Sequence, residues 1–293
     1  MTKISGIFAA TMSVLDSDLS LNVEKTIDHA EKLIDNGCHG TAIFGSTGQS
    51  QLISISEKID LLNKLSKSKY KDKHLIGTGL NSLSETINFM EISCSLGFSK
   101  FLIMPPAYYK YGDKEVVNFY TRIIDKISNC KIILYNFEKL SGYKFSINII
   151  EKLVKDFPKQ ILAVKDSSYN LYEELKIPDF MIFPGSETKL LKGLELGCSG
   201  IISAICNVTA PLARKVYDDF NNKKKQTFNE RLCKIRKIFD KYNLISAVHS
   251  FMSVEDEKYK IILPPLSLLS KEEEKKMIDE LKNLDFYPES KAA

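Results

Sequence analysis

Short apolar segments recur along the chain, and each is followed by a longer stretch with the periodicity of an amphipathic helix. Eight segments begin near Ile4, Gly40, His74, Lys100, Lys131, Ile161, Phe180 and Gly200. They lie about 20 to 35 residues apart, the length of a β-strand with its crossover helix. The segments 132–135 and 161–164 are apolar without alternation, which is typical of parallel strands covered on both faces.

The stretches between the apolar segments carry helix start signals. Ser54 with Glu57, and Ser82 with Glu85, have the spacing of a capping box, in which the two residues satisfy each other's backbone N–H groups. Eight strand–helix units in about 220 residues predict a (β/α)8 TIM barrel. The alternative is a doubly wound sheet, which usually has a glycine-rich turn after its first strand. Residues 11–15 contain no glycine, and this favours the barrel.

The pattern changes after residue 221, where a polar connector at 221–225 is followed by helical periodicity. We therefore predict a barrel with the active site over residues 1–221 and a C-terminal helical appendage over residues 222–293. The run of Lys and Glu at 271–276 is interpreted as a solvated helix face.

Composition narrows the chemistry. The 293 residues include 41 Lys+Arg and 37 Asp+Glu, a net charge of +4 without a long basic run, and this predicts no nucleic-acid partner. No apolar run reaches the roughly 18 residues of a membrane span, so we expect no membrane contact and a cytoplasmic location. Only 4 His and 6 Cys are present, and none of the cysteines forms a C-x-x-C pair, so we predict reduced thiols and no metal site. Proton transfer is then expected from Lys, Tyr or carboxylates.

The active site of a TIM barrel lies at the C-terminal ends of the strands. Lys165 ends the apolar run 161–164. If its side chain points inward, desolvation favours the neutral amine, which can attack a ketone. The alternative is a surface lysine paired with Asp166. Tyr135 ends the preceding predicted strand and is expected beside Lys165, where it can shuttle protons, or it is an aromatic cap on the core.

Two further strand ends carry candidate polar groups. The turn Gly45-Ser-Thr-Gly48 offers N–H groups and two hydroxyls that suit a carboxylate or a phosphate. It lacks the lysine of a nucleotide-binding loop, and an ordinary turn is the alternative. Tyr108 and Tyr109 are a second source of hydroxyls, an aromatic lid or part of an interface.

Six short segments at the predicted strand ends carry a family resemblance. They are Gly45-Ser-Thr-Gly48, Gly77-Thr-Gly-Leu-Asn81, Pro106-Ala-Tyr-Tyr109, Leu134-Tyr-Asn136, Val164-Lys-Asp166 and Gly200-Ile-Ile-Ser203. In this order, over residues 4–220, they resemble the pyruvate-dependent class I aldolases typified by dihydrodipicolinate synthase and N-acetylneuraminate lyase. The resemblance favours the functional interpretation of Lys165.

The resemblance implies a covalent mechanism without a cofactor or metal. Lys165 would form a Schiff base with the C2 carbonyl of pyruvate or another 2-keto acid. Tyr135, Thr47 and Tyr109 would relay protons, with Tyr109 supplied by a neighbouring subunit, as in many members. Homo-oligomers, most often tetramers, are implied as well.

The resemblance also implies how the keto acid is held. The carboxylate would bind Ser46 and the N–H groups of the turn around Thr47 and Gly48. The main-chain carbonyl of Ile202 would face the pyruvyl part of the pocket. Gly185 follows the seventh predicted strand, which begins near Phe180, and is also expected to line the substrate site. The acidic residue after that strand, Glu187, matches one of those that bind sugar hydroxyls in N-acetylneuraminate lyases.

Several positions depart from the family pattern. Lysine-biosynthetic members have an arginine that clamps the carboxylate of aspartate semialdehyde. Here that position is Leu140, which cannot make a bidentate contact, and the adjacent Lys139 would act only as a point charge. The sequence Leu-Ser-Gly at 140–142 is instead similar to N-acetylneuraminate lyases. Ala204 replaces the serine that sialic acid enzymes carry, and Gln49 replaces the family's usual glutamate.

We therefore predict a Schiff-base lyase, similar to N-acetylneuraminate lyase or to a keto-deoxy sugar acid aldolase, that cleaves or forms a 2-keto-3-deoxy acid from pyruvate and an aldehyde. Glu187 indicates a hydroxylated aldehyde. The alternatives are 4-hydroxy-tetrahydrodipicolinate synthase with Lys139 in place of the arginine, and a dehydratase acting on the same imine. A keto-acid-binding barrel without turnover is the alternative of another class, although a binder would not need both Lys165 and Tyr135.

Overall fold

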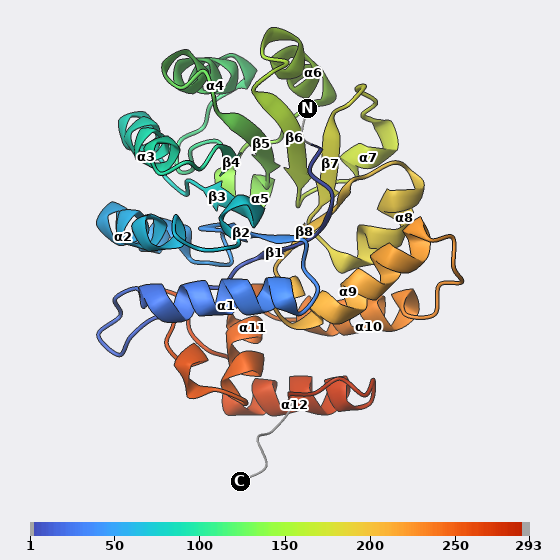
Figure 1. Cartoon of the computed structure of the whole chain (residues 1–293). Helices are drawn as coiled ribbons and strands as arrows, with labels where there is room; N and C mark the ends of the chain where they lie inside the picture. Colours follow the sequence, from blue (N-terminus) through green and yellow to red (C-terminus); the bar gives the residue numbers. More distant parts are fainter. Residues whose placement is uncertain (1–2, 289–293) are drawn as a thin grey trace.

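The structure is a computed structural model, and it describes residues 3–288. Its centre is a barrel of eight parallel strands (Figure 1). The strands are β1 (Gly6–Ala10), β2 (Gly40–Ile43), β3 (His74–Gly77), β4 (Lys100–Ile103), β5 (Lys131–Asn136), β6 (Ile161–Asp166), β7 (Met181–Pro184) and β8 (Gly200–Ser203). Their order is β7-β6-β5-β4-β3-β2-β1-β8. The N–H of Ser199 donates to the carbonyl of Ile182 at 3.1 Å and links the two ends of the sheet. The predicted TIM barrel is confirmed.

Helices cover the outside of the barrel between successive strands (Figure 1). They are α1 (Val23–Asp35), α2 (Ile55–Leu65), α3 (Leu83–Ser95), α4 (Asp113–Lys126), α6 (Ile147–Asp156), α8 (Leu190–Glu195) and α9 (Cys206–Asn221), with the short helices α5 (Glu138–Ser141) after β5 and α7 (Leu171–Glu174) after β6. Four 3₁₀ turns also occur: η1 (Ser50–Leu52), η2 (Lys71–Lys73), η3 (Glu187–Lys189) and η4 (Glu257–Tyr259).

Of the two predicted capping boxes, the one before α2 is complete and the one before α3 is half formed. At the start of α2, Ser54 and Glu57 form the complete capping box. At the start of α3, the Ser82 side chain accepts a hydrogen bond from the Glu85 N–H, whereas the return bond from Ser82 to the Glu85 side chain is not formed. Both serines therefore satisfy a free helix N–H group.

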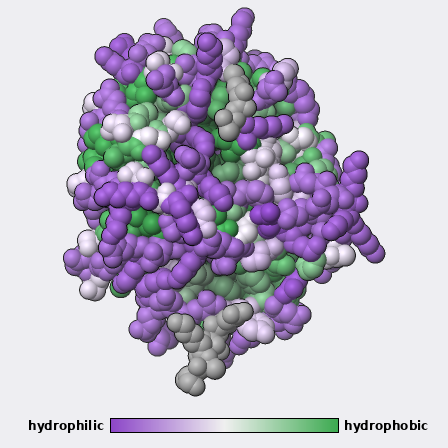
Figure 2. All heavy atoms as spheres, viewed as in Figure 1, coloured by the Kyte–Doolittle hydropathy of each residue, from purple (hydrophilic) through white to green (hydrophobic). Residues whose placement is uncertain are grey.

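Three helices follow the barrel: α10 (Asn229–Phe239), α11 (Leu244–Ser253) and α12 (Lys271–Lys282). Their apolar side chains share a buried cluster with the loop that follows β1, through Met12 and Val14. The surface in Figure 2 is mostly hydrophilic, and residues 271–276 of α12 are exposed or half-buried. No helix in the described part of the chain is long and apolar enough to cross a membrane.

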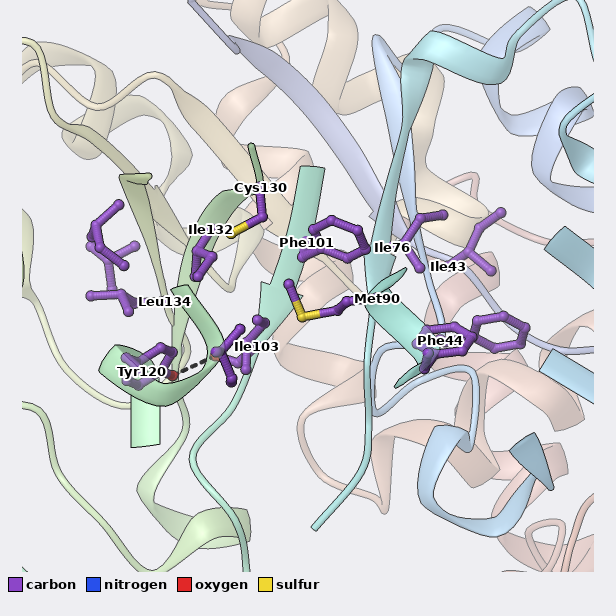
Figure 3. Close-up of a cluster of buried hydrophobic side chains, with 14 of the residues drawn as sticks. Ile43, Phe44, Ile76, Met90, Phe101, Ile103, Tyr120, Cys130, Ile132 and Leu134 are labelled. Atoms are coloured by element: carbon purple, nitrogen blue, oxygen red, sulfur yellow. Dashed lines mark hydrogen bonds between the residues drawn. The ribbon is translucent and has the colours of Figure 1, made fainter. Parts of the chain in front are cut away.

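The strands bury alternate residues on the two sides of the barrel wall. Ile132 and Leu134 of β5 pack outward against the helices, beside Phe101 and Ile103 of β4 (Figure 3). Ile133 belongs instead to the cluster inside the barrel. Successive side chains of a strand point to opposite faces, so residue 135 returns to the inside. The alternation of side chains along β5 therefore places Tyr135 inside the barrel.

Candidate active site

Lys165 and Tyr135 meet at the mouth of the barrel. They are paired across the parallel ladder of β5 and β6, and they are only 3% and 4% exposed. The Lys165 Nζ lies 4.0 Å from the centre of the Tyr135 ring. Within residues 3–288, this amine makes no hydrogen bond or ion pair. A buried amine without an acceptor is not committed to holding the fold together.

Asp166 does not pair with Lys165, although the two are adjacent in sequence. Its carboxylate accepts hydrogen bonds from the Asn136 side chain at 3.0 Å and from the N–H groups of Tyr169 at 3.0 Å and Leu171 at 2.9 Å. These bonds anchor the loop after β6. The alternative of a surface Lys165–Asp166 pair is therefore wrong, because the strand sends the two side chains to opposite sides.

The phenol of Tyr135 is linked to the turn after β2. Its hydroxyl lies 2.9 Å from the Oγ of Ser46. Thr47 is buried next to Ser46, but no hydrogen bond of the described residues joins Thr47 to Tyr135. The structure thus brings together Lys165, Tyr135 and Ser46, and Ser46 occupies the hydroxyl position that we expected for Thr47.

The backbone of the turn after β2 adopts a conformation that few residue types can adopt. Phe44 and Gln49 flank it with φ angles of +59° and +54°. A side chain at Gly48 would bring its Cβ within 2.8 Å of the Thr11 carbonyl oxygen. The Gly48 and Gln49 N–H groups are bonded inside the turn. The N–H groups of residues 46 and 47 donate to no described residue, so the turn can accept an anionic group at this point.

A cavity of about 360 Å³ opens beside Tyr135 and this turn. Its lining residues are Phe44, Gly45, Ser46, Gln49, Ser50, Gln51, Leu52, Gly79, Leu102, Met104, Tyr135, Leu140, Ile245, Pro265 and Leu266. None of these side chains is charged.

Three of the lining residues, Ile245, Pro265 and Leu266, lie beyond residue 221. The cavity therefore extends outside the residues 1–221 that we predicted to carry the site. The side chain of Gln49 connects the two parts, since its Oε1 accepts a hydrogen bond from the Leu263 N–H at 2.7 Å. Sequence patterns gave no signal for this wall.

Glu187 is fully buried and is not among the residues that line the cavity. Its carboxylate is paired with Arg236 of α10 at 2.8 Å and accepts a contact from the Cys206 thiol at 3.4 Å. Arg236 also donates to the carbonyl of Gly185 at 3.3 Å and to the Ser203 Oγ at 3.1 Å.

The guanidinium of Arg236 stays charged inside the protein. Burial lowers the pKa of Arg236, but the neighbouring carboxylates of Glu187 and Asp240 outweigh this and raise the pKa overall. The structure thus assigns Glu187 to a buried ion pair with Arg236, and not to the aldehyde as we expected. The sequence did not single out Arg236, which lies 49 residues from Glu187.

The remaining predicted residues lie in separate places. Leu140, on α5, lines the cavity with 44% of its surface exposed, and Lys139 is exposed outside the lining. Ile202 is buried inside the barrel on β8. Tyr109 is 75% exposed, packed edge-on against Tyr108, and within this single chain it does not reach Lys165.

The site can be compared with known proteins. A family model described as the dihydrodipicolinate synthetase family matches residues 3–284. The chain is 31% identical to a 4-hydroxy-tetrahydrodipicolinate synthase of Lactobacillus acidophilus, over 67% of this chain and 63% of that protein. It is 29% identical to an N-acetylneuraminate lyase of Actinobacillus pleuropneumoniae, over 74% and 76%.

A solved structure extends the likeness to the whole fold. The crystal structure of dihydrodipicolinate synthase from Agrobacterium tumefaciens superposes with a TM-score of 0.87 at 22% identity, and the match covers 96% of this chain and 99% of that one. The match of the family model over nearly the whole length decides the classification. The chain belongs to the dihydrodipicolinate synthetase family.

Proposed function

We propose that the protein is a lysine-dependent class I aldolase that joins pyruvate to an aldehyde or releases pyruvate from a 2-keto-3-deoxy acid. The observation that carries this proposal is the amine of Lys165, which is buried, has no acceptor among the described residues and lies against the Tyr135 ring. Relatives named as a synthase and as a lyase of keto acids support it.

The imine chemistry follows from the positions of these groups. The Lys165 amine attacks the C2 carbonyl of pyruvate, the resulting hydroxyl leaves as water, and a protonated imine forms. Loss of a proton from C3 gives an enamine, and cleavage of a C3–C4 bond gives the same enamine in the opposite direction. The imine is itself the electron sink, so the proposed reaction uses no metal or cofactor.

Tyr135 is the proposed proton carrier for these steps. Its hydroxyl is hydrogen-bonded to Ser46 at 2.9 Å, which gives the phenol a route for the exchanged proton. The substrate carboxylate would bind at the turn beside Gly48 through the free N–H groups of residues 46 and 47, with Thr47 and the Ile202 carbonyl around the pyruvyl group. Tyr109, exposed on one chain, would complete the relay in a neighbouring subunit of a cytoplasmic homotetramer.

Two alternatives are less well supported. A synthase acting on aspartate semialdehyde needs a cation at the far end of the cavity, but Lys139 is exposed and does not line it. A binding protein without turnover would gain nothing from a buried amine that lacks an acceptor, since burying a polar group without a hydrogen bond costs free energy.

The proposal is tested by trapping the imine. The protein is incubated with pyruvate and borohydride, and its intact mass and its activity in pyruvate release are measured. We expect one reduced pyruvyl group per chain and a matching loss of activity, with neither change when pyruvate is omitted. Unchanged mass and activity would exclude the Schiff-base mechanism.

A further inference from the structure

One wall of the cavity beside Tyr135 is apolar. Side chains from five separate segments form this wall, namely Leu52, Met104, Leu140, Ile245 and Leu266. They come from η1, the loop after β4, α5, α11 and the segment before α12. Because the wall is built from distant parts of the sequence, it is a property of the folded chain and not of one hydrophobic run.

The few polar side chains in the lining are mostly engaged with the protein. The Ser46 hydroxyl is bonded to Tyr135. The Gln49 amide accepts from the Leu263 N–H at 2.7 Å and lies 3.4 Å from the His249 ring nitrogen. The Ser50 hydroxyl has no hydrogen-bond partner among the described residues; it is buried against Gly79, where a Cβ would lie 1.8 Å from it. A substrate with several hydroxyl groups would therefore find only the Ser50 hydroxyl and the exposed Gln51 amide free to replace its hydrogen bonds to water.

Charge recognition is also lacking at this wall. Leu140 lines the cavity with an apolar side chain, which offers no hydrogen-bond donor to a carboxylate. Glu187, the acidic residue that could bind hydroxyls, is closed off by Arg236 at 2.8 Å. Among the described residues, no charged side chain lines the cavity. An anionic aldehyde would have to be desolvated there without an ion pair.

We propose that the aldehyde partner is uncharged and carries an aliphatic or aromatic substituent, which packs between Leu52, Leu140 and Leu266. This inference rests on the proposed aldolase function and specifies its substrate class. The volume of about 360 Å³ lies at the lower end of the range of about 300 to 1,000 Å³ found for pockets that bury drug-sized ligands.

The reaction of such an aldehyde balances without an added reductant or oxidant. The enamine C3 attacks the aldehyde carbon, the C3–C4 bond forms, and the C=O π bond breaks. The resulting oxygen takes a proton from Tyr135. Water then hydrolyses the imine, which returns Lys165 as the amine and releases a 4-hydroxy-2-keto acid with the apolar substituent on C4.

The test compares aldehydes in one assay of pyruvate consumption. 2-Methylpropanal and benzaldehyde represent the apolar class, glyceraldehyde the hydroxylated class and aspartate semialdehyde the charged class. We expect kcat/KM for an apolar aldehyde to exceed those for the other two by about tenfold or more, the discrimination that apolar contacts provide in enzyme pockets. A preference for glyceraldehyde or aspartate semialdehyde, or no turnover of any apolar aldehyde, would overturn the inference.

A pair of variants links the preference to the cavity. Leu140→Arg introduces a cation into the lining, and Leu196→Arg introduces the same residue at a leucine of equal exposure, 42% against 44%, outside the lining. We expect Leu140→Arg to lower kcat/KM for the apolar aldehyde about tenfold and to raise it for aspartate semialdehyde. Leu196→Arg should leave both unchanged. Equal effects of the two variants would overturn the assignment of this wall.

Borohydride trapping with pyruvate separates the two levels of the proposal. If the pyruvyl adduct forms as expected but the protein prefers a polar aldehyde, only the proposed substrate class is overturned. No trapping in the unmodified protein overturns the aldolase function, and the substrate class with it.

Discussion

Two buried lysines lie in different layers of this molecule, and only one is proposed to be catalytic. Lys58, on α2, is fully buried between helix and barrel, and its Nζ donates to the Thr78 carbonyl at 3.0 Å. Lys165 is equally buried but lies inside the barrel mouth without an acceptor among the described residues. Each amine is near an aromatic ring, Phe44 at 5.8 Å and Tyr135 at 4.0 Å.

The difference shows that burial does not by itself mark a nucleophile. Burial lowers the pKa of Lys58 to about 8, against the smaller opposing effect of Glu85. Nevertheless, the Lys58 amine donates to the carbonyl of Thr78, the residue that follows β3. What distinguishes Lys165 is an amine left without a structural partner, beside a phenol that is itself bonded to a hydroxyl. The following predictions test this distinction.

The largest expected effect is the loss of imine formation in Lys165→Met. This variant should form no borohydride adduct with pyruvate and should lose turnover by at least about a thousandfold, since the nucleophile is gone. Lys58→Met is the matched control, because it removes a second buried amine of the same type. It should retain both the adduct and the activity, and loss of the adduct in Lys58→Met would contradict the comparison.

The next effect concerns two buried tyrosines. Tyr135→Phe should reduce kcat by about 100- to 10,000-fold, the usual contribution of a proton-transfer group, while the ring contact with Lys165 is kept. Tyr120→Phe is the control, because the Tyr120 hydroxyl donates to the Ile103 carbonyl at 2.8 Å in the outer layer (Figure 3). It should cost about 1 kcal/mol of stability and little activity. Similar rates for the two variants would argue against a proton relay through Tyr135.

A third prediction concerns Arg236, a buried cation that is paired with the Glu187 carboxylate. Arg236→Met leaves the Glu187 carboxylate buried without its cation, so the free energy of unfolding should fall by about 3 to 5 kcal/mol. The double variant Arg236→Met/Glu187→Gln should recover most of this loss. Chemical denaturation measures both. No recovery in the double variant would show that Arg236 acts mainly through its other contacts, to Asp240, Gly185 and Ser203.

The smallest effect is a dependence of stability on pH. The folded pKa of Lys58, about 8, lies below its ordinary value of 10.5, so between these values the unfolded chain binds more protons than the folded one. Stability contributed by this site therefore rises with pH across the window. Between pH 8 and pH 10 the native protein should gain about 2 kcal/mol relative to Lys58→Met, measured by denaturant unfolding. If the difference in the free energy of unfolding between the two proteins is the same at pH 8 and pH 10, the Lys58 amine is not desolvated.

The sequence anticipated the features that follow from strand order and parity. Tyr135 and Lys165 end neighbouring parallel strands, so their pairing was predictable once the barrel was recognised. The family classification was also predictable, because six strand-end segments resemble those of the family and occur in the same order.

The features that the sequence did not reveal depend on long-range packing. Glu187 looked accessible because its partner, Arg236, approaches from a helix beyond the barrel. The cavity wall formed by Ile245 and Leu266 depends on how α11 and the segment after it fold back over the turn, which no local pattern encodes. Lys58 looked like any polar residue of an amphipathic helix, and its burial became visible only in the packed structure.

The most direct test of the account is to locate the reduced pyruvyl group after borohydride trapping. Proteolysis and peptide mass mapping assign the modified residue in the unmodified protein and in Lys58→Met. The account predicts a single modified lysine, Lys165, in both proteins. Modification of Lys58 or of exposed lysines, with Lys165 unmodified, would contradict it.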